Sequence, residues 1–142
     1  MEELLAYIKP AIAVIPVSKS GAAIAATAVD ARGYARAAFL FLTGAMGTGA
    51  VVTCSVTESA SSGGTYAQKS TTAALTNLAA ATGLNKLYAI DVPINSSKPY
   101  LKLYGTCATA AVLHGAICLL YRGVNSVDPN LDTVLSQYVR KI

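Results

Sequence analysis

Residues 49–67 of this chain read GAVVTCSVTESASSGGTYA, and their pattern decides the fold class. Positions 50–58 alternate between two sides, with Ala50, Val52, Cys54 and Val56 on one and Val51, Thr53, Ser55 and Thr57 on the other. A period of two with one apolar and one mostly polar side predicts a half-buried β-strand. The Ser- and Gly-rich continuation predicts a loop. Glu58 is the only charged residue in the stretch, so it offers little for acid–base chemistry.

Similar segments occur on either side of this strand. The sequence predicts strands at 34–43, 86–93, 100–107 and 110–121, a weaker strand at 22–29, and a long connection with a strand fragment at 70–85. Residues 39–42 (FLFL) are apolar on both faces, which is typical of a strand covered on both sides. Many short strands separated by Gly and Ser turns, without strand–helix alternation, favour an all-β sandwich or barrel.

The composition indicates a single domain that meets a partner. The chain has 142 residues, of which 54% are hydrophobic and only 13% are charged, against about 25% charged in an average soluble domain. This length is enough to bury a core. A chain with so little charged surface is expected to cover part of its apolar surface with another protein.

The N-terminal residues predict an arm outside the sandwich. Residues 1–10 resemble a short amphipathic helix that ends at Lys9-Pro10, because the residue before proline avoids the helical region. Residues 11–17 (AIAVIPV) are apolar, but Pro16 limits them to an edge strand or an extended arm. We therefore assign residues 1–20 to an arm and residues 21–123 to the sandwich.

The C-terminal residues 124–142 predict a short helical tail. Asp128 is a suitable N-cap and Pro129 suits the first helical position. The apolar residues that follow recur at helical spacing as far as Arg140, and the helix could pack on its own sandwich or on a neighbouring subunit.

We expect these two ends to be the main docking elements between subunits, since each carries an apolar stripe. The residues expected at the interface are Leu4, Leu5, Ile8, Ile12, Val14, Leu131, Val134, Leu135 and Tyr138. Burying each large side chain would contribute on the order of 1.5–3 kcal/mol.

The sequence argues against a membrane protein and against a secreted one. The apolar run at 105–121 is shorter than the roughly 20 residues of a spanning helix and contains His114. Glu2 and Glu3 stand where a signal peptide would be basic, so we expect synthesis and retention in a cytoplasm, at least at first.

Cys54, Cys107 and Cys118 are expected to be reduced core residues. They are odd in number and form no CxxC or Cys/His motif, although a single disulfide remains an alternative. A zinc site is disfavoured because the only histidine has no second ligand nearby.

No constellation in the sequence predicts catalysis, a cofactor or a metal site. His114 shares a strand face with apolar residues, which is typical of a core histidine. Asp91 is the best-placed acid, but it has no second acid near it in the sequence. The segment GAMGTG at 44–49 lacks the Lys-Ser/Thr ending of a phosphate loop.

The net charge of +4 does not predict specific nucleic-acid binding, because the basic residues are dispersed. Tyr100, Lys102 and Tyr104 share one strand face, as a stacking platform for single-stranded nucleic acid requires. An ordinary exposed sheet face explains the same pattern and is the favoured interpretation.

Three runs resemble small virion proteins of tailed bacteriophages: VVTCSVTESASSGGTYAQ (51–68), LYAIDVPINSSKPYLKLYGT (87–106) and AAVLHGAICLLYRG (110–123). The closest likeness is to head decoration (cement) proteins, and it covers residues 31–123. It implies a jelly-roll-like β-sandwich without a catalytic site, which binds outside the major capsid protein lattice and resists the pressure of packaged DNA. The implied location is the virion, and we expect a homo-oligomer, a trimer or dimer.

Two alternatives to a decoration protein remain. One is another virion component, from the tail or the head–tail junction. The other is a carbohydrate-binding adhesion module, which the absence of Trp makes less favourable.

Overall fold

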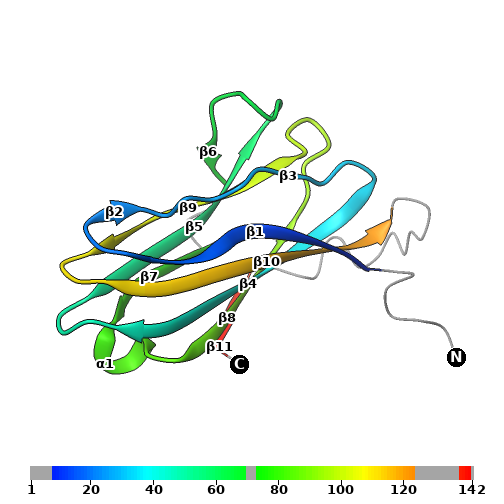
Figure 1. Ribbon diagram of the computed structural model, residues 1–142. Coiled ribbons are helices and arrows are strands. Elements are labelled where there is room, and N and C mark those ends of the chain that lie inside the picture. The colour runs from blue at the N-terminus through cyan, green and yellow to red at the C-terminus, as the bar shows by residue number, and fades with distance from the viewer. Residues whose placement is uncertain (1–7, 70–72, 124–137, 142) are drawn as a thin grey trace, which may run out of the picture.

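The computed structural model describes residues 8–69, 73–123 and 138–141, which form two packed antiparallel β-sheets (Figure 1). Sheet A has the strand order β1-β10-β4-β8-β11. Its strands are β1 (Ile8–Lys19), β10 (Val112–Gly123), β4 (Tyr34–Met46), β8 (Lys86–Pro93) and β11 (Tyr138–Lys141). The β-sandwich predicted from the sequence is confirmed.

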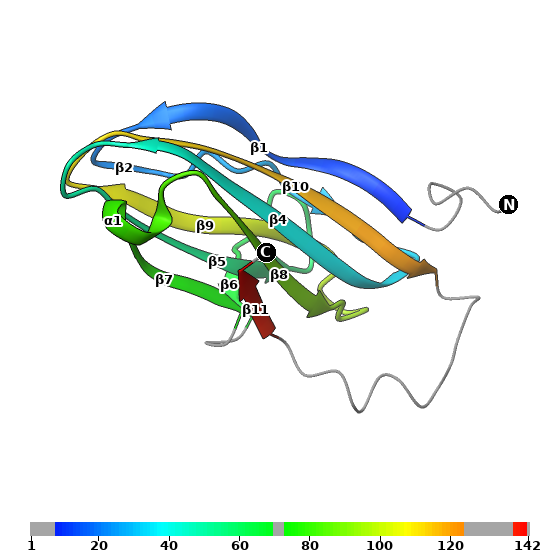
Figure 2. The ribbon, with the colours of Figure 1, turned by 90° about the horizontal axis from the view of Figure 1, so that it is seen from below.

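Sheet B forms the second layer, which lies below sheet A in Figure 2. Its strands are β2 (Ala22–Ala23), β3 (Val29–Asp30), β9 (Tyr100–Ala108), β5 (Val51–Ser59), β6 (Ala67–Gln68) and β7 (Ala74–Ala79). The ambiguous stretch at 70–85 contributes β7 and one helical turn, α1 (Ala80–Gly83).

The strands pair in a nested order that gives the jelly-roll topology. The first strand, β1, pairs with β10; β2 and β3 pair with β9; β4 pairs with β8; and β5 pairs with β7. Pairing early strands with late ones folds the chain as one long hairpin that is wrapped into two sheets. The two sheets therefore share one core.

The core consists of the inward-facing residues of both sheets. Val52, Cys54 and Val56 of β5 are at most 2% exposed, which confirms the alternation predicted for residues 50–58. Phe39 and Phe41 of β4 are fully buried on the inner side of sheet A.

The expectation that β4 is covered on both sides is wrong. Leu42 is 54% exposed and Leu40 is only partly buried, because their side chains point to the outer side of sheet A. An antiparallel sheet in a two-layer sandwich has one face on the core and the other toward solvent. The apolar side chain of Leu42 is therefore exposed on the surface of the sandwich.

The N-terminal segment is part of the sandwich from residue 8 onward, so the predicted arm at 1–20 is wrong over residues 8–20. Ile8–Pro10 belong to β1 and not to a helix, and residues 1–7 lie outside the described ranges. The alternative of an edge strand is confirmed, because β1 is an edge of sheet A. The ladder breaks between Val14 and Val17, where Pro16 has no N–H to donate.

The helix predicted for residues 129–140 is wrong at its end. Residues 124–137 lie outside the described part of the chain, and Tyr138–Lys141 form β11, which pairs antiparallel with β8. The free edge of β8 offers backbone hydrogen bonds, and Tyr and Val favour strands. A helical spacing in sequence cannot detect this long-range pairing.

Gly105 in β9 provides a sharp test of the pairing between β9 and β5. A Cβ atom at this position would overlap the carbonyl oxygen of Thr53 and lie 2.9 Å from the Cα atom of Cys54. We expect Gly105→Ala to lower the free energy of unfolding by about 2–4 kcal/mol in urea denaturation. The control is Gly63→Ala in the open loop, where a Cβ meets nothing within 4 Å and the change should stay within about 0.5 kcal/mol. Equal stability of the two variants would contradict the close approach.

Candidate functional site

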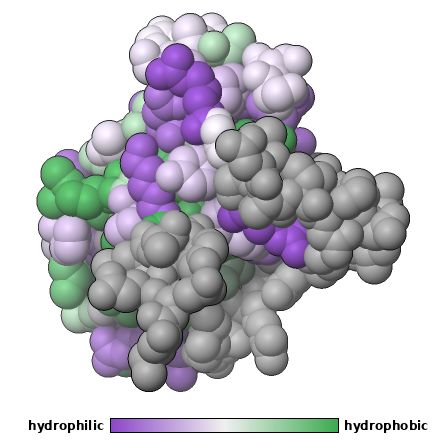
Figure 3. Space-filling model, turned by 90° about the vertical axis from the view of Figure 1, so that its right-hand side faces the viewer, coloured by the Kyte–Doolittle hydropathy of each residue, from purple (hydrophilic) through white to green (hydrophobic). Residues whose placement is uncertain are grey.

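The outer side of sheet A carries most of the exposed large hydrophobic side chains of the described residues. Five large side chains lie there: Ile12 (61% exposed), Ile15 (65%), Leu42 (54%), Leu113 (44%) and Ile117 (45%). We call these five residues the sheet A patch. In the view of Figure 3, hydrophobic atoms gather along the left margin, the side on which sheet A lies.

The strand register joins these side chains into one surface. Ile12 lies opposite Ile117, and Ile117 lies opposite Leu40 on β4. Leu42 lies opposite Leu87 on β8. Directly opposed side chains of an antiparallel sheet contact each other, so the apolar surface is continuous across β1, β10, β4 and β8.

Two glycines keep this surface low. A Cβ at Gly44 would lie 2.9 Å from Cδ2 of Leu113, and a Cβ at Gly115 would lie 3.1 Å from Cγ of Pro16. The side chain of Leu113 therefore packs against the backbone at Gly44, and the ring of Pro16 packs against the backbone at Gly115. These two side chains fill the space above the glycines, so they do not protrude far from the outer face of sheet A.

A polar cluster closes one end of this face. Arg36 lies in β4 opposite Tyr121 of β10, and its Nη2 donates to Oδ2 of Asp91 at 3.0 Å. The Tyr121 hydroxyl also donates to that oxygen, at 2.7 Å, and Nε of Arg36 donates to the Tyr121 hydroxyl at 3.1 Å. Arg36 is only 1% exposed, so a charged group is buried with its counter-ion.

This arrangement holds Asp91 as an ion-pair partner. Burial, and secondly the hydrogen bond to Asp91, raise the pKa of Tyr121 to about 12, so the hydroxyl remains a donor at neutral pH. All these donors converge on Oδ2, and Oδ1 is buried without a hydrogen-bond partner. The Asp91 carboxylate therefore links β8 to β4 and β10 through Arg36 and Tyr121. A carboxylate that already accepts these hydrogen bonds is poorly placed to accept a proton from a substrate.

His114 lies in the core, as its strand face predicted. It is 2% exposed, its Nδ1 lies 3.0 Å from the carbonyl oxygen of Val112, and its ring stacks on Phe41 at 5.9 Å. Within the described ranges no group of three or more His, Cys, Asp or Glu residues could hold a metal ion.

The three cysteines are buried and unpaired in the structure, as expected of core residues. Desolvation raises the pKa of Cys54 and of Cys118 to about 12 and also raises the pKa of Cys107. A thiol that stays protonated at neutral pH is a weak nucleophile.

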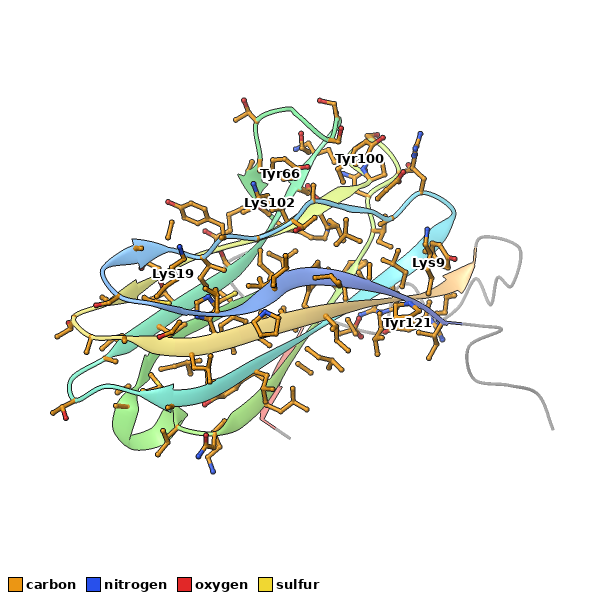
Figure 4. The ribbon with its side chains drawn as sticks, in the orientation of Figure 1. Lys9, Lys19, Tyr66, Tyr100, Lys102 and Tyr121 are labelled. Carbon is orange, nitrogen blue, oxygen red and sulfur yellow. The ribbon has the colours of Figure 1, made fainter. Side chains whose placement is uncertain are left out.

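The outer side of sheet B is polar, in contrast to that of sheet A. Tyr100, Lys102 and Tyr104 share this face, as predicted, and Tyr104 is 64% exposed. Nζ of Lys102 lies 5.6 Å from the ring centre of Tyr66, and the guanidinium carbon of Arg32 lies 5.5 Å from that of Tyr100 (Figure 4). One ring of the predicted platform, Tyr100, thus already carries a cation of the same chain, and Lys102 is engaged with Tyr66. This suits an ordinary exposed sheet face better than a stacking platform.

Glu58, the lone charge of residues 49–67, fixes the loop that follows β5. Its Oε2 lies 2.6 Å from Nζ of Lys69, and its Oε1 lies 3.7 Å from Nζ of Lys98. The side chain of Lys69 is 8% exposed and that of Glu58 is 11% exposed, so this pair is largely desolvated. Its role is structural.

The structure changes the set of interface residues predicted from the sequence. Ile12 is exposed in the sheet A patch and Ile8 is partly buried, but Val14 is 1% exposed and belongs to the core, because β1 has a bulge at this point. Tyr138 lies in β11 and not in a helix. The other expected residues lie outside the described ranges: Leu4, Leu5, Leu131, Val134 and Leu135.

Sequence reasoning missed four residues of the patch, namely Ile15, Leu42, Leu113 and Ile117. The signal was present for Leu42 and Ile117, because residues 39–42 and 116–120 are apolar at consecutive positions. Combined with the antiparallel fold class, such runs indicate an apolar outer face.

No known protein-family model matches this chain, and no curated protein matches it in sequence. None of the helices in the described ranges is long and apolar enough to cross a membrane.

Thiol titration can measure directly whether the three cysteines are reduced. We expect no rapid reaction of native protein with a thiol reagent at neutral pH, and three titratable thiols per chain after unfolding without reductant. One free thiol after unfolding would mean that a disulfide exists.

The Arg36–Asp91 pair gives a stability test. Arg36→Met should lower the free energy of unfolding by about 3 kcal/mol, because it leaves a partly buried carboxylate without its counter-ion. The double variant Arg36→Met/Asp91→Leu should recover more than half of that loss. A double variant as unstable as the single one would show that the unpaired charge is not the cause.

Proposed function

We propose that this chain is a structural virion protein that binds the outside of a phage capsid and stabilises the lattice of the major capsid protein. It acts by covering joints between capsid subunits, and it needs no cofactor. Its partners are the major capsid protein and further copies of itself, as a trimer or dimer. It is made in the host cytoplasm and resides on the virion.

The observation that carries this proposal is the exposed sheet A patch on a sandwich that already has a complete core. The sandwich buries Phe39, Phe41 and Val52 without help from a partner. The five large aliphatic side chains of the sheet A patch are exposed and do not contribute to that core. A contiguous apolar face of this kind is typical of a protein that functions in contact with another surface.

The chemistry of the described polar groups supports a binding role over an enzymatic one. His114 is in the core, Asp91 is paired with Arg36, and Glu58 is paired with Lys69. Catalysis needs a titratable group within reach of a substrate proton. The sequence resemblance over residues 31–123 points to the same class of protein.

The tail or head–tail junction remains the alternative location for such a protein. A carbohydrate-binding role would use the outer side of sheet B, where Tyr104 is exposed, but the chain has no Trp to stack on a sugar ring.

The test is a comparison of virus particles with and without the protein. Heads from a strain deleted for the gene should lose their DNA at a lower temperature than wild-type heads. Adding the purified chain should restore wild-type heat resistance and saturate at a fixed number of copies per head. Equal resistance of both kinds of head, with no saturable binding, would refute a capsid-stabilising role. Binding to isolated tails alone would favour the alternative location.

A further inference from the structure

Most strand edges in the described ranges are protected against pairing with another chain. The edge strand β1 carries Pro10 and Pro16, and a backbone bridge to Ala26 covers its middle. The other edge of sheet A, β11, carries Arg140 and Lys141. In sheet B, the strands β2, β3 and β6 are each two residues long. Proline, charge and short length are the usual means by which sheets prevent edge-to-edge association.

Strand β7 lacks all three kinds of protection. It has six residues and pairs with β5 on one side, and no other described strand pairs with it. Figure 2 shows β7 at the margin of its layer, beyond β9 and β5. Residues 70–85 include neither a charged residue nor a proline. Among the described strands, β7 therefore presents the longest edge that nothing in its own sequence protects.

The strand register identifies backbone groups that point to this open edge. Ser55 of β5 lies opposite Ala74, and the next residue, Val56, donates its N–H to the carbonyl oxygen of Ala73 at 3.0 Å. In an antiparallel ladder, hydrogen-bonded pairs alternate with pairs whose backbone groups point outward. The N–H and C=O of Ala74 therefore point away from β5. Such groups are satisfied by an extended strand that lies alongside.

We infer that β7 pairs antiparallel with β7 of a second copy of this chain, so that sheet B continues across a two-fold dimer. The inference rests on the proposed function only in identifying this dimer with the homo-oligomer named there. It does not require a capsid, because the contact forms between free copies. An edge contact of this kind leaves the outer faces of both sheets uncovered.

The absence of charge favours an identical strand as the occupant. In a two-fold pair, each residue of β7 lies near residues of the other β7, so like charges would be brought together and would oppose pairing. The strand β7 brings no charge to such a contact. The same contact through β11 would bring Arg140 and Lys141 of both copies together, which disfavours that edge.

A single unprotected edge also limits the size of the assembly. Pairing β7 with β7 uses the same edge on both copies, so the contact closes on itself. A ring or a filament would need a second, different edge on each copy, and the remaining described edges are protected. The expected species is therefore a dimer and not a trimer or a polymer.

An exposed apolar side chain follows the C-terminal end of β7. The helical turn α1 packs against the strand, since a Cβ at Gly83 would lie 3.4 Å from the Cβ of Leu78. The next residue, Leu84, is 44% exposed and lies outside the sheet A patch. In an antiparallel pair this end of β7 lies beside the start of the other β7, so the second copy is in reach of this apolar surface.

The test compares two full-length proline variants with wild type. Ala74→Pro removes an N–H that points to the open edge, and the proline ring blocks the approach of a second strand. The matched control is Ala23→Pro in β2. There the N–H also points away from the neighbouring strand, because the next residue, Ile24, donates its N–H to the carbonyl oxygen of Gly105 at 2.9 Å. Both variants are checked for native circular dichroism and thermal unfolding, and oligomeric state is measured by sedimentation velocity over a range of protein concentrations.

We expect wild type and Ala23→Pro to form a dimer with similar dissociation constants. The dissociation constant of Ala74→Pro should be at least about tenfold higher, because a two-fold contact loses one hydrogen bond from each copy.

Hydrogen exchange of wild type gives a second readout, which decides the question if Ala74→Pro does not fold. We expect the amides of residues 74–78 to exchange more slowly as the protein concentration rises, because pairing with a second strand protects them.

Several results would overturn the inference. Wild type that stays monomeric, without concentration-dependent protection of residues 74–78, would show that β7 does not pair with a second copy. A dimer that Ala74→Pro leaves intact, or that Ala23→Pro weakens equally, would place the contact elsewhere, and a trimer would contradict the two-fold geometry. Protection of residues 74–78 that appears only when heads are added to a monomer would assign the edge to the capsid protein. The proposed function fails by a different result, the absence of saturable binding to heads.

Discussion

A sandwich of two β-sheets can bury only one face of each sheet, and this limit governs the molecule. The nested pairing of β1 with β10 and of β4 with β8 builds sheet A, which has one face on the core and one face outward. Because side chains alternate along a strand, Phe39 and Phe41 fill the core while Leu42 points outward. The apolar outer face is therefore a consequence of the topology together with a strand that is apolar on both sides.

The two outer faces differ in kind. On sheet B, hydroxyl groups pair across strands, as Thr53 does with Thr106 at 3.2 Å, and the lysine and tyrosine side chains are compatible with water. On sheet A, aliphatic side chains meet aliphatic side chains, and the main polar group, Arg36, is buried with Asp91. The two outer faces of the sandwich therefore differ in polarity, with an aliphatic side on sheet A and a polar side on sheet B.

Much of the fold could be predicted from the sequence, since alternation at residues 50–58 and proline at position 16 act locally. The core position of His114 followed from its strand neighbours in the same way. The exposed outer face of β4 was missed because a run such as FLFL is also typical of a strand that is covered on both sides. Only its combination with an antiparallel two-layer fold indicates that Leu42 faces outward. Strand β11 was missed because it depends on the edge of β8, more than 40 residues earlier in the chain. The link between Arg36 and Asp91 likewise spans strands that only the fold brings together.

The most direct measurement is a cryo-electron microscopy reconstruction of decorated heads in which the two sheets of this protein can be told apart. The account predicts that sheet A faces the capsid, with Leu42 and Ile117 covered by the capsid protein. It predicts that Tyr104 on sheet B faces solvent. A reconstruction with sheet A exposed to solvent and sheet B against the capsid would contradict it.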